Sequence, residues 1–151
     1  MKIYVATSWR NRYQPEVVQR LRGEGYDVYD FRNPAPSQCG FAWEEIDSGW
    51  RQWSVADYSR ALIHPAAAIG FRRDFEALAE CEVCVLLLPS GASAHLEAGW
   101  CAGQGKRVLV FAPVLPEPEL MYKLFDSEEG SSILESLDDL VVRLQELGSR
   151  K

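Results

Sequence analysis

Short apolar runs alternate with helix-like segments along this chain, and this alternation limits its possible folds more than any other feature. We predict strands over residues 2–6, 26–31, 83–88 and 107–111. We predict helices over residues 14–22, 54–63, 72–79, 93–102 and 133–147. A succession of strand, helix and strand builds a parallel sheet through right-handed crossovers, with helices on both faces. The pattern therefore predicts an α/β, doubly wound parallel sheet of four to five strands.

Local signals support this pattern. The run at residues 83–88, VCVLLL, is apolar throughout, as in a strand that is covered on both faces. Ser54, followed three residues later by Asp57, resembles a capping box at the start of a helix. Residues 32–53 show no clear period. Residues 113–130 contain three prolines and several acidic residues, and we expect them to form a long surface loop.

The length, the net charge and the short apolar runs of the chain argue against a nucleic-acid-binding protein or a membrane protein. The chain has 151 residues, which matches a single domain. Its 16 basic and 22 acidic residues give a net charge of −6, the wrong sign for following a nucleic-acid backbone. The apolar runs are far shorter than the ~20 residues of a membrane span, and the N-terminus reads as a strand without a signal core. We expect a cytoplasmic protein whose partner is a small molecule, not a nucleic-acid polymer or a membrane.

The four cysteines do not form a metal-binding pattern. Cys81 and Cys84 make one C-x-x-C pair, whereas a zinc site needs a second close pair of ligands. Cys39 and Cys101 stand alone in the sequence. We expect the thiols to pack as small apolar groups and no metal to be bound.

The loops that follow the predicted strands are where we expect a ligand. Parallel sheets bind ligands beyond the carboxyl ends of their strands, at the point where the strand order reverses. This rule selects residues 7–12, residues 89–93 and the chain from Ala112 onward. The first of these loops lacks the glycines of a dinucleotide-binding fingerprint and of a P-loop.

Residues 89–93, PSGAS, join a predicted buried strand to a helix. Ser90, Gly91 and Ser93 provide two hydroxyl groups, a permissive backbone and free N–H groups at a helix N-terminus, which together suit a phosphate. Alternatively, Ser93 only caps its helix. In the loop after the first strand, Ser8 and Arg10 either contact the same kind of anion or form a polar turn with a surface arginine.

Two acidic residues suit bond-breaking chemistry. Glu97 lies four residues after Ser93, near the positive end of the predicted helix, which favours an ionised carboxylate able to act as a nucleophile. Asp74 lies at a predicted helix start and could share a proton with a leaving group. The alternatives are a surface Glu97 and an Asp74 that caps its helix. Paired carboxylates of this kind cleave glycosidic bonds.

Several other residues could either contact a ligand or have a purely structural role. Gly99 and Gly103 lower the stability of their helix, which indicates a close approach there, either by a ligand or by the sheet. The tryptophans of the irregular segment could stack on a nucleobase or pack in the core or an interface; they are Trp43, Trp50 and Trp53. No Ser or Cys lies at a motif spacing from His95, so we assign it to no catalytic triad. We treat His95 as a candidate ligand contact.

Four of these motifs, in this order, resemble the nucleoside 2-deoxyribosyltransferase superfamily. They are IYVATSWR at residues 3–10, GFRRD at 70–74, SGASAHLEAG at 90–99 and GKRVLV at 105–110. That superfamily has an Asp before its third strand, a Ser/Gly-rich loop, a Glu-x-Gly helix and a Gly-Lys-x-Val strand. The resemblance covers roughly the first 112 residues as an ordered set of short motifs.

The resemblance implies roles for individual residues. Glu97 matches the nucleophile that attacks the anomeric carbon, Asp74 a carboxylate that assists proton transfer to the base, and Tyr4 a tyrosine that orients the catalytic Glu. It also implies that no cofactor is needed and that the protein is a homo-oligomer, a dimer or larger.

The resemblance further implies where a phosphate is held. The Ser8/Arg10 turn and the 90–93 loop match the places where the nucleotide-hydrolase branch holds a 5′-phosphate. Transferases that use free nucleosides commonly carry an acidic residue at the head of the latter loop, where this chain has Ser90 and Gly91. Hydroxyl and N–H groups attract a phosphate that a carboxylate would repel.

These observations lead to one hypothesis and two alternatives. The hypothesis is a flavodoxin-like N-glycosidase that hydrolyses the base–sugar bond of a (deoxy)nucleoside 5′-monophosphate through a Glu97 glycosyl-enzyme intermediate. One alternative is a nucleoside 2-deoxyribosyltransferase that exchanges bases through the same intermediate. The other is a non-catalytic nucleotide sensor.

Overall fold

The computed structural model describes residues 1–35, 38–114, 117–126 and 130–149. The chain forms two compact units. Unit 1 contains Met1–Asp30 and Glu80–Lys151, and unit 2 contains Phe31–Ala79. Unit 1 carries the whole β-sheet, and unit 2 is built from helices and irregular segments.

The sheet of unit 1 has five parallel strands in the order β2-β1-β3-β4-β5. The strands are β1 (Lys2–Ala6), β2 (Asp27–Tyr29), β3 (Val83–Leu87), β4 (Arg107–Phe111) and β5 (Ile133–Leu134). This is the flavodoxin-like order, in which the direction of winding reverses between β1 and β3. The predicted fold class, an α/β parallel sheet of the flavodoxin-like type, is therefore confirmed.

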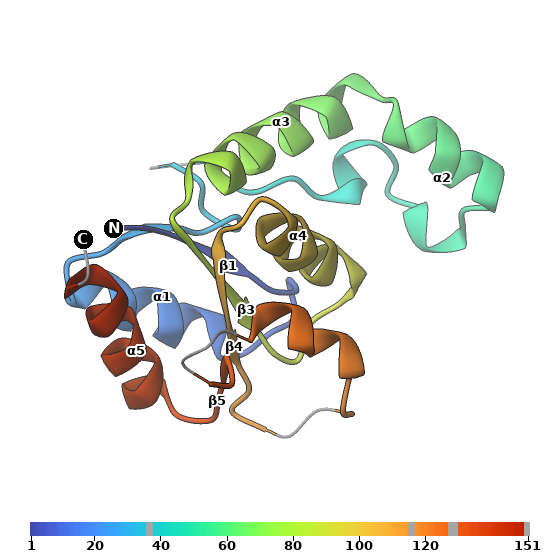
Figure 1. Ribbon diagram of the computed structural model, residues 1–151. Helices are drawn as coiled ribbons and strands as arrows, with labels where there is room; N and C mark the ends of the chain where they lie inside the picture. Colours follow the sequence, from blue (N-terminus) through green and yellow to red (C-terminus); the bar gives the residue numbers. More distant parts are fainter. Residues whose placement is uncertain (36–37, 115–116, 127–129, 150–151) are drawn as a thin grey trace. The chain divides into compact units, whose positions relative to one another are not determined.

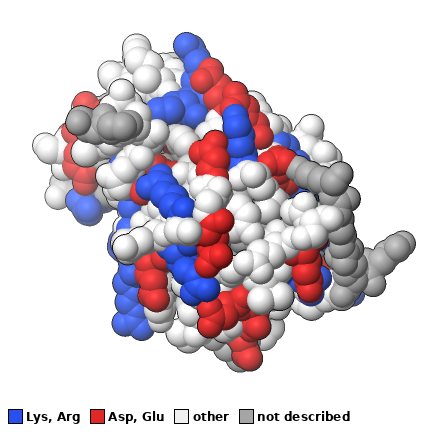
Figure 2. Space-filling view, turned by 90° about the vertical axis from the view of Figure 1, so that its left-hand side faces the viewer, with Lys and Arg blue, Asp and Glu red and all other residues white. Residues whose placement is uncertain are grey.

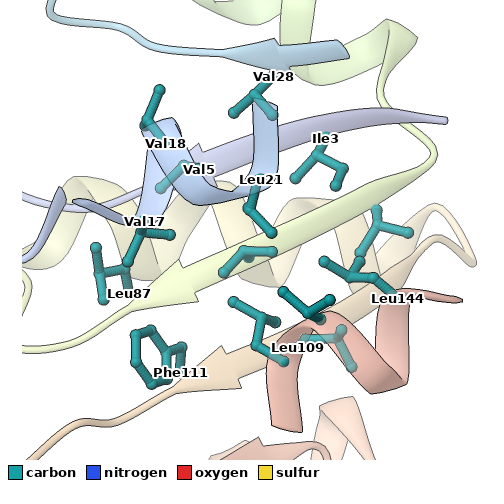
Figure 3. Packing of buried hydrophobic residues seen from close by; sticks show 14 residues of the cluster. Ile3, Val5, Val17, Val18, Leu21, Val28, Leu87, Leu109, Phe111 and Leu144 are labelled. Carbon is teal, nitrogen blue, oxygen red and sulfur yellow. The ribbon is translucent and has the colours of Figure 1, made fainter. Parts of the chain in front are cut away.

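Helices cover both faces of this sheet (Figure 1). On one face, α1 (Gln14–Gly23) and α5 (Leu137–Ser149) pack against strand residues that include Ile3, Leu87 and Leu109 (Figure 3). On the other face, α4 (Ala92–Gly103) contacts β1, β3 and β4. All five residues of β3 are buried, because a central parallel strand is covered from both sides.

Small side chains bring α4 close to the sheet. The buried residues of α4 are Ala94, Ala98 and Cys101, which recur at the spacing of one helix face. Gly99 and Gly103 do not take part in this approach, since no atom lies within 4 Å of where a Cβ would be at either position. Close packing of these two glycines on the sheet, one of the two interpretations given above, is therefore not present among the described residues.

Unit 2 is organised around an aromatic cluster. The ring of Trp43 meets the rings of Phe41, Trp53 and Tyr58 edge-on, at centroid distances of 4.9, 5.7 and 5.7 Å. Trp43 begins one short 3-10 helix, η1 (Trp43–Glu45), and a second, η2 (Trp50–Gln52), follows. The indole N–H of Trp53 donates to Asp47 Oδ2 at 2.6 Å. For Trp43 and Trp53, packing is thus the role that the structure shows.

The helices of unit 2 correct one sequence prediction. Helix α2 (Val55–Leu62) has the predicted Ser54 cap, with its hydroxyl accepting from the Asp57 N–H at 3.2 Å. Helix α3 (Pro65–Glu80) was predicted to begin at residue 72, but begins at Pro65. Pro65 stops one helix and starts the next, because proline has no N–H to contribute and its fixed φ suits the first helical turn.

The C-terminal part of unit 1 differs from prediction in two places. Residues 133–136 were predicted to be helical, but Ile133–Leu134 pairs with β4 as β5, and Ser136 caps α5 by accepting from the Asp139 N–H at 3.0 Å. The predicted loop 113–130 contains a 3-10 helix, η3 (Leu120–Phe125). The other parts of this prediction at residues 115–116 and 127–129, and residues 36–37 of the irregular segment, lie outside the described residues.

The surface of the described chain carries mixed charges. Figure 2 shows Lys and Arg interspersed with Asp and Glu on the face that it presents. Several form exposed pairs, such as Lys2 with Glu80 at 2.7 Å and Arg20 with Glu24 at 3.0 Å. Exposed pairs of this type contribute little to stability. Among the described helices, none is long and apolar enough to cross a bilayer.

Gly70, inside α3, is required by a close contact within unit 2. A Cβ at this position would lie 2.6 Å from the Cβ of Phe41, an atom that its own backbone holds in place. Gly70→Ala is expected to lower the free energy of unfolding by ~1–3 kcal/mol, because the added methyl group overpacks the contact. Urea unfolding followed by circular dichroism measures the change.

Gly99→Ala is the matched control for this substitution. It places the same methyl group in open space within a helix, so helix propensity alone is expected to raise the stability, by up to ~1 kcal/mol. Equal effects of the two substitutions would contradict the close contact at Gly70.

Candidate active site

The carboxyl ends of β1 and β3 meet where the sheet reverses its winding, and two buried polar residues join the loops that follow them. Thr7 Oγ1 donates to the carbonyl of Leu87 at 2.7 Å. Asn11 Nδ2 donates to the carbonyl of Pro89 at 3.0 Å and to that of Leu87 at 3.3 Å. These bonds hold the 7–12 and 89–93 loops together at the edge where parallel sheets bind ligands. The loops that follow β1 and β3, two of the three loops where we expected a ligand, are therefore held together.

A tyrosine and a glutamate meet beneath this edge. Tyr4, on β1, is only 1% exposed, and its hydroxyl donates to Glu97 Oε1 at 3.2 Å. Glu97 lies in the second turn of α4 and is half-buried. A carboxylate that accepts a hydrogen bond from a buried donor has a restricted orientation, which is what a reacting group requires.

The strand register explains why Tyr4 faces α4. Neighbouring residues of a strand point to opposite faces, so Ile3 and Val5 face α1 and α5 while Tyr4 faces α4. Tyr4 is in register with Tyr29 of β2, and the two rings stack at 5.4 Å with an interplanar angle of 17°. Tyr29 thus supports the ring whose hydroxyl holds Glu97.

Among the residues that the structure describes, no side chain caps the N-terminus of α4. Gly91 is the N-cap residue and makes no capping hydrogen bond through a side chain, so Ser93, inside the first turn, is not the cap. The alternative in which Ser93 only caps the helix is therefore wrong. Ser90 Oγ is buried without a hydrogen-bond partner among the described residues. Uncapped first-turn N–H groups and a buried hydroxyl without a partner are features of an anion site.

Ser8 and Arg10 lie in the loop after β1, which Asn11 joins to the end of β3. Ser8 is half-buried and Arg10 is exposed. Arg10 forms no ion pair with the part of the chain that the structure describes, so its guanidinium group is available for a ligand.

His95 is held by contacts within unit 1. Its Nδ1 lies 2.9 Å from the carbonyl of Gly91, and its Nε2 lies 2.8 Å from the hydroxyl of Tyr122. A carbonyl only accepts, so Nδ1 carries a proton and, in a neutral ring, Nε2 accepts from Tyr122. Burial raises the pKa of the Tyr122 phenol, which keeps this donor protonated. His95 therefore links the N-cap of α4 to η3, a connection that the sequence analysis did not foresee.

Asp74 belongs to unit 2, where it lies in the middle of α3. The cap interpretation of Asp74 is wrong, because the helix begins at Pro65. Its Oδ1 lies 3.8 Å from Nε of Arg73, and its side chain is 28% exposed.

The buried thiols lie on the α4 side of the sheet and are not a reactive group. A hydrogen bond with Cys101 and burial raise the pKa of Cys81 far above its ordinary value. The hydrogen bond from Cys81 lowers the pKa of Cys101, but the hydrogen bond with Cys84 and burial raise it to about 12. Thiols with raised pKa values stay protonated and are poor nucleophiles. Within the described residues, no group of His, Cys, Asp and Glu side chains is arranged to hold a metal ion.

Four residues of this site have roles that were not predicted from the sequence: Thr7, Asn11, Tyr29 and Tyr122. Thr7 and Asn11 lie in the predicted ligand loop, directly after a strand. Polar side chains at that place could have indicated hydrogen bonds to the neighbouring strand end. The roles of Tyr29 and Tyr122 depend on strand register and on the path of the chain after β4. Neither is visible in the linear sequence.

Solved structures show which proteins share this fold. A 2-deoxyribosyltransferase from the psychrotolerant bacterium Bacillus psychrosaccharolyticus is 18% identical, with a TM-score of 0.58 over 93% of this chain and 90% of that chain. The CMP N-glycosidase BcmB of Clostridium botulinum is 14% identical, with a TM-score of 0.51 over 96% of this chain and 99% of that chain. A conserved protein from Enterococcus faecalis V583 is 16% identical, with a TM-score of 0.56 over 100% and 99%.

The sequence comparisons gave no match. No protein-family model matches the sequence, and no curated protein is similar enough to it to count as a match. The chain has the fold of the three solved structures, two of which are named as a 2-deoxyribosyltransferase and a CMP N-glycosidase.

Proposed function

We propose that this chain is an N-glycosidase that hydrolyses the base–sugar bond of a nucleoside or deoxynucleoside 5′-monophosphate. The observation that carries the proposal is the 3.2 Å hydrogen bond from the buried Tyr4 hydroxyl to Glu97 Oε1, at the reversal point of the sheet. The order of motifs in the sequence and the fold shared with a 2-deoxyribosyltransferase and a CMP N-glycosidase support it.

The proposed reaction has two steps through Glu97. A carboxylate oxygen of Glu97 attacks C1′ of the sugar, the C1′–N bond breaks, and the base leaves with the electron pair and takes up a proton. Water then attacks C1′ of the glycosyl ester, which releases the sugar phosphate and a proton and regenerates the carboxylate. Tyr4 keeps the carboxylate in one orientation, while the stacked ring of Tyr29 supports Tyr4.

The preference for a phosphate rests on the N-terminus of α4. The uncapped N–H groups after Gly91 and the buried hydroxyl of Ser90 would donate to the phosphate oxygens, and the helix dipole would favour their charge. Arg10, from the neighbouring loop, would add a planar, charged donor. His95 would act on the ligand indirectly, because it holds the carbonyl of Gly91.

Asp74 is proposed as the acid that protonates the departing base. This role comes from the resemblance of the GFRRD segment to the superfamily motif. A leaving base needs a proton because its anion is a poor leaving group.

A panel of substrates tests the proposed function. The protein is incubated with 5′-monophosphates and with the matching nucleosides, and the products are separated by chromatography. Release of free base and sugar phosphate from a monophosphate, at a higher rate than from the nucleoside, is the expected result. Binding without any release of base would contradict the proposal and indicate a nucleotide sensor.

A base-exchange activity is the second candidate, because the fold is shared with a 2-deoxyribosyltransferase. The same panel distinguishes base exchange from hydrolysis when a free base, different from that of the substrate, is added to each reaction. A transferase passes the sugar from Glu97 to that base and forms a new nucleoside or nucleotide, whereas a hydrolase forms only the sugar product.

Tyr4→Phe tests the hydrogen bond on which the proposal depends. Removal of the hydroxyl leaves the ring and its stacking on Tyr29, but frees the orientation of Glu97. Base release is expected to fall ~10–100-fold, since hydrogen bonds to charged groups contribute ~1.5–3 kcal/mol. Initial rates measured under saturating substrate check this effect on kcat.

Tyr13→Phe is the matched control for Tyr4→Phe. Its hydroxyl bonds the guanidinium of Arg12 at 2.8 Å and not Glu97. The control is expected to keep its rate of base release, and an equal loss in both variants would contradict the role of Tyr4.

A further inference from the structure

The carbonyl at the start of α4 receives two hydrogen bonds from the same residue. Gly91 is the N-cap, so its carbonyl accepts the first bond of the helix, from the backbone N–H of His95. The protonated Nδ1 of the His95 ring lies 2.9 Å from the same oxygen. A carbonyl oxygen has two lone pairs and accepts both bonds, and together the two donors fix its direction.

The direction of this carbonyl also sets the direction of the first N–H group of the helix. The bond between Gly91 and Ala92 is trans and planar, so the Ala92 N–H points opposite to the Gly91 carbonyl. This N–H has no acceptor within the helix, and no side chain of the described residues caps the helix. A rotation of the Gly91–Ala92 peptide plane therefore moves one donor of the proposed phosphate site.

Tyr122 determines which nitrogen of His95 carries the proton. Its hydroxyl lies 2.8 Å from His95 Nε2, and the two rings stack at 5.8 Å with an interplanar angle of 13°. A neutral histidine has a single ring N–H, so a hydroxyl that donates to Nε2 keeps the proton on Nδ1, where it faces Gly91. Without this hydroxyl the proton can move to Nε2, and the lone pair of Nδ1 then repels the carbonyl.

The ring of Tyr122 is itself held by buried neighbours. Tyr122 is only 8% exposed, and its ring stacks on that of Phe125 at 5.9 Å. The carbonyl of Phe125 accepts a hydrogen bond from the hydroxyl of Ser132, which is also buried. The donor that reaches His95 therefore comes from a side chain with little freedom to move.

We propose that Tyr122 is a positioning residue for the phosphate site, which acts through His95 to hold the Gly91–Ala92 peptide plane in the orientation that binds a phosphate oxygen. This inference rests on the proposed function, which assigns a phosphate to the N-terminus of α4. It deepens that function by naming a residue that determines the preference for a monophosphate over a nucleoside.

Tyr122→Phe removes the hydroxyl and keeps the stacked ring. The dissociation constant of inorganic phosphate is expected to rise ~10-fold, because one donor to a charged ligand loses its orientation. The rise of the melting temperature with phosphate concentration, at constant ionic strength, measures this constant. In the kinetic assay, KM for the monophosphate is expected to rise by a similar factor, with little change in kcat or in kcat/KM for the matching nucleoside. A merely structural role would affect both substrates alike.

Two substitutions of His95 with nearly the same shape test the route. His95→Asn places an amide N–H near the position of Nδ1, whereas His95→Leu has no donor. The asparagine variant is expected to keep most of the affinity for phosphate, and the leucine variant is expected to lose as much as Tyr122→Phe. In the double variant H95N/Y122F, the loss of the tyrosine hydroxyl is expected to have no further effect, because an amide always carries its protons.

Tyr26→Phe is the control, because Tyr26 packs against the apolar cluster on the face of the sheet that α1 and α5 cover. It is expected to leave the affinity for phosphate unchanged, and circular dichroism establishes that each variant is folded. Unchanged affinity in Tyr122→Phe, equal losses in the two His95 variants, or equal losses for monophosphate and nucleoside would each overturn the inference. A chain that binds phosphate but releases no base contradicts the proposed reaction and leaves the inference to the binding data, whereas a chain that binds no phosphate overturns both.

Discussion

Glu97→Gln is expected to abolish nearly all release of base, with a loss on the order of 10⁴–10⁶-fold, while the protein keeps its fold and its affinity for the nucleotide. The amide has nearly the shape of the carboxylate and still accepts the hydrogen bond from Tyr4, but it is too weak a nucleophile to form the glycosyl ester. Rates of base release and calorimetric binding to the same 5′-monophosphate measure the two properties separately.

Two companion variants make this result specific. Glu97→Ala opens space beside the sugar, so added formate is expected to restore part of the rate by replacing the missing carboxylate. Glu146→Gln is the control, because Glu146 lies on α5 with a half-exposed side chain, 3.7 Å from Arg143. Base release that is unchanged in Glu97→Gln would rule out the covalent mechanism.

Trapping of the intermediate complements the kinetic test. In the original protein, rapid acid quenching during turnover is expected to leave the sugar phosphate attached to the peptide that contains Glu97, as an added mass. The added mass is expected to be absent from Glu97→Gln. An adduct on another peptide would show that the nucleophile is a residue other than Glu97.

Ser90→Asp is expected to change which substrate the protein prefers. Ser90 Oγ is buried without a partner at the head of α4, beside the uncapped helix N-terminus. A carboxylate at this position would repel a 5′-phosphate, and two like charges placed next to each other cost several kcal/mol. The value of kcat/KM for the monophosphate is therefore expected to fall ~100-fold or more. The value for the matching nucleoside is expected to change less, because its neutral 5′-hydroxyl can donate to the new carboxylate.

Ser90→Asn separates charge from size. Asparagine has nearly the shape of aspartate without its charge, so Ser90→Asn is expected to affect monophosphate and nucleoside to a similar degree. Melting temperatures of both variants check that the buried position tolerates the larger side chain. If both variants shift the preference equally, the effect comes from size, and the proposed phosphate site is contradicted.

Some parts of the fold follow from local sequence alone. The unbroken apolar run at β3 predicted a central buried strand, and Ser54 with Asp57 predicted the start of α2. Both signals are carried by a few neighbouring residues: an unbroken apolar run, and a hydroxyl group three residues before the N–H that it caps. Where two local signals compete, prediction failed: Pro65 was interpreted as a stop and is also the start of α3.

Some residues of the candidate site could likewise be predicted from the sequence, and others could not. Glu97, Ser90 and Gly91 could be selected from the sequence because a loop and helix that follow a buried strand lie at the ligand edge of a parallel sheet. The structure adds what depends on residues far apart in the chain. His95 meets Tyr122, and Asn11 meets the carbonyl of Pro89, through hydrogen bonds that no local pattern predicts.

The sequence by itself determined that this chain builds a parallel α/β sheet and that Ser90 and Gly91 follow the carboxyl end of a buried strand, because hydrophobic periodicity and turn chemistry are local properties. Only the tertiary structure decided that Tyr4 meets Glu97, ninety-three positions away, and that Tyr29 stacks behind it. These contacts depend on strand order and register, which arise when the whole sheet packs against its helices and not from any one segment.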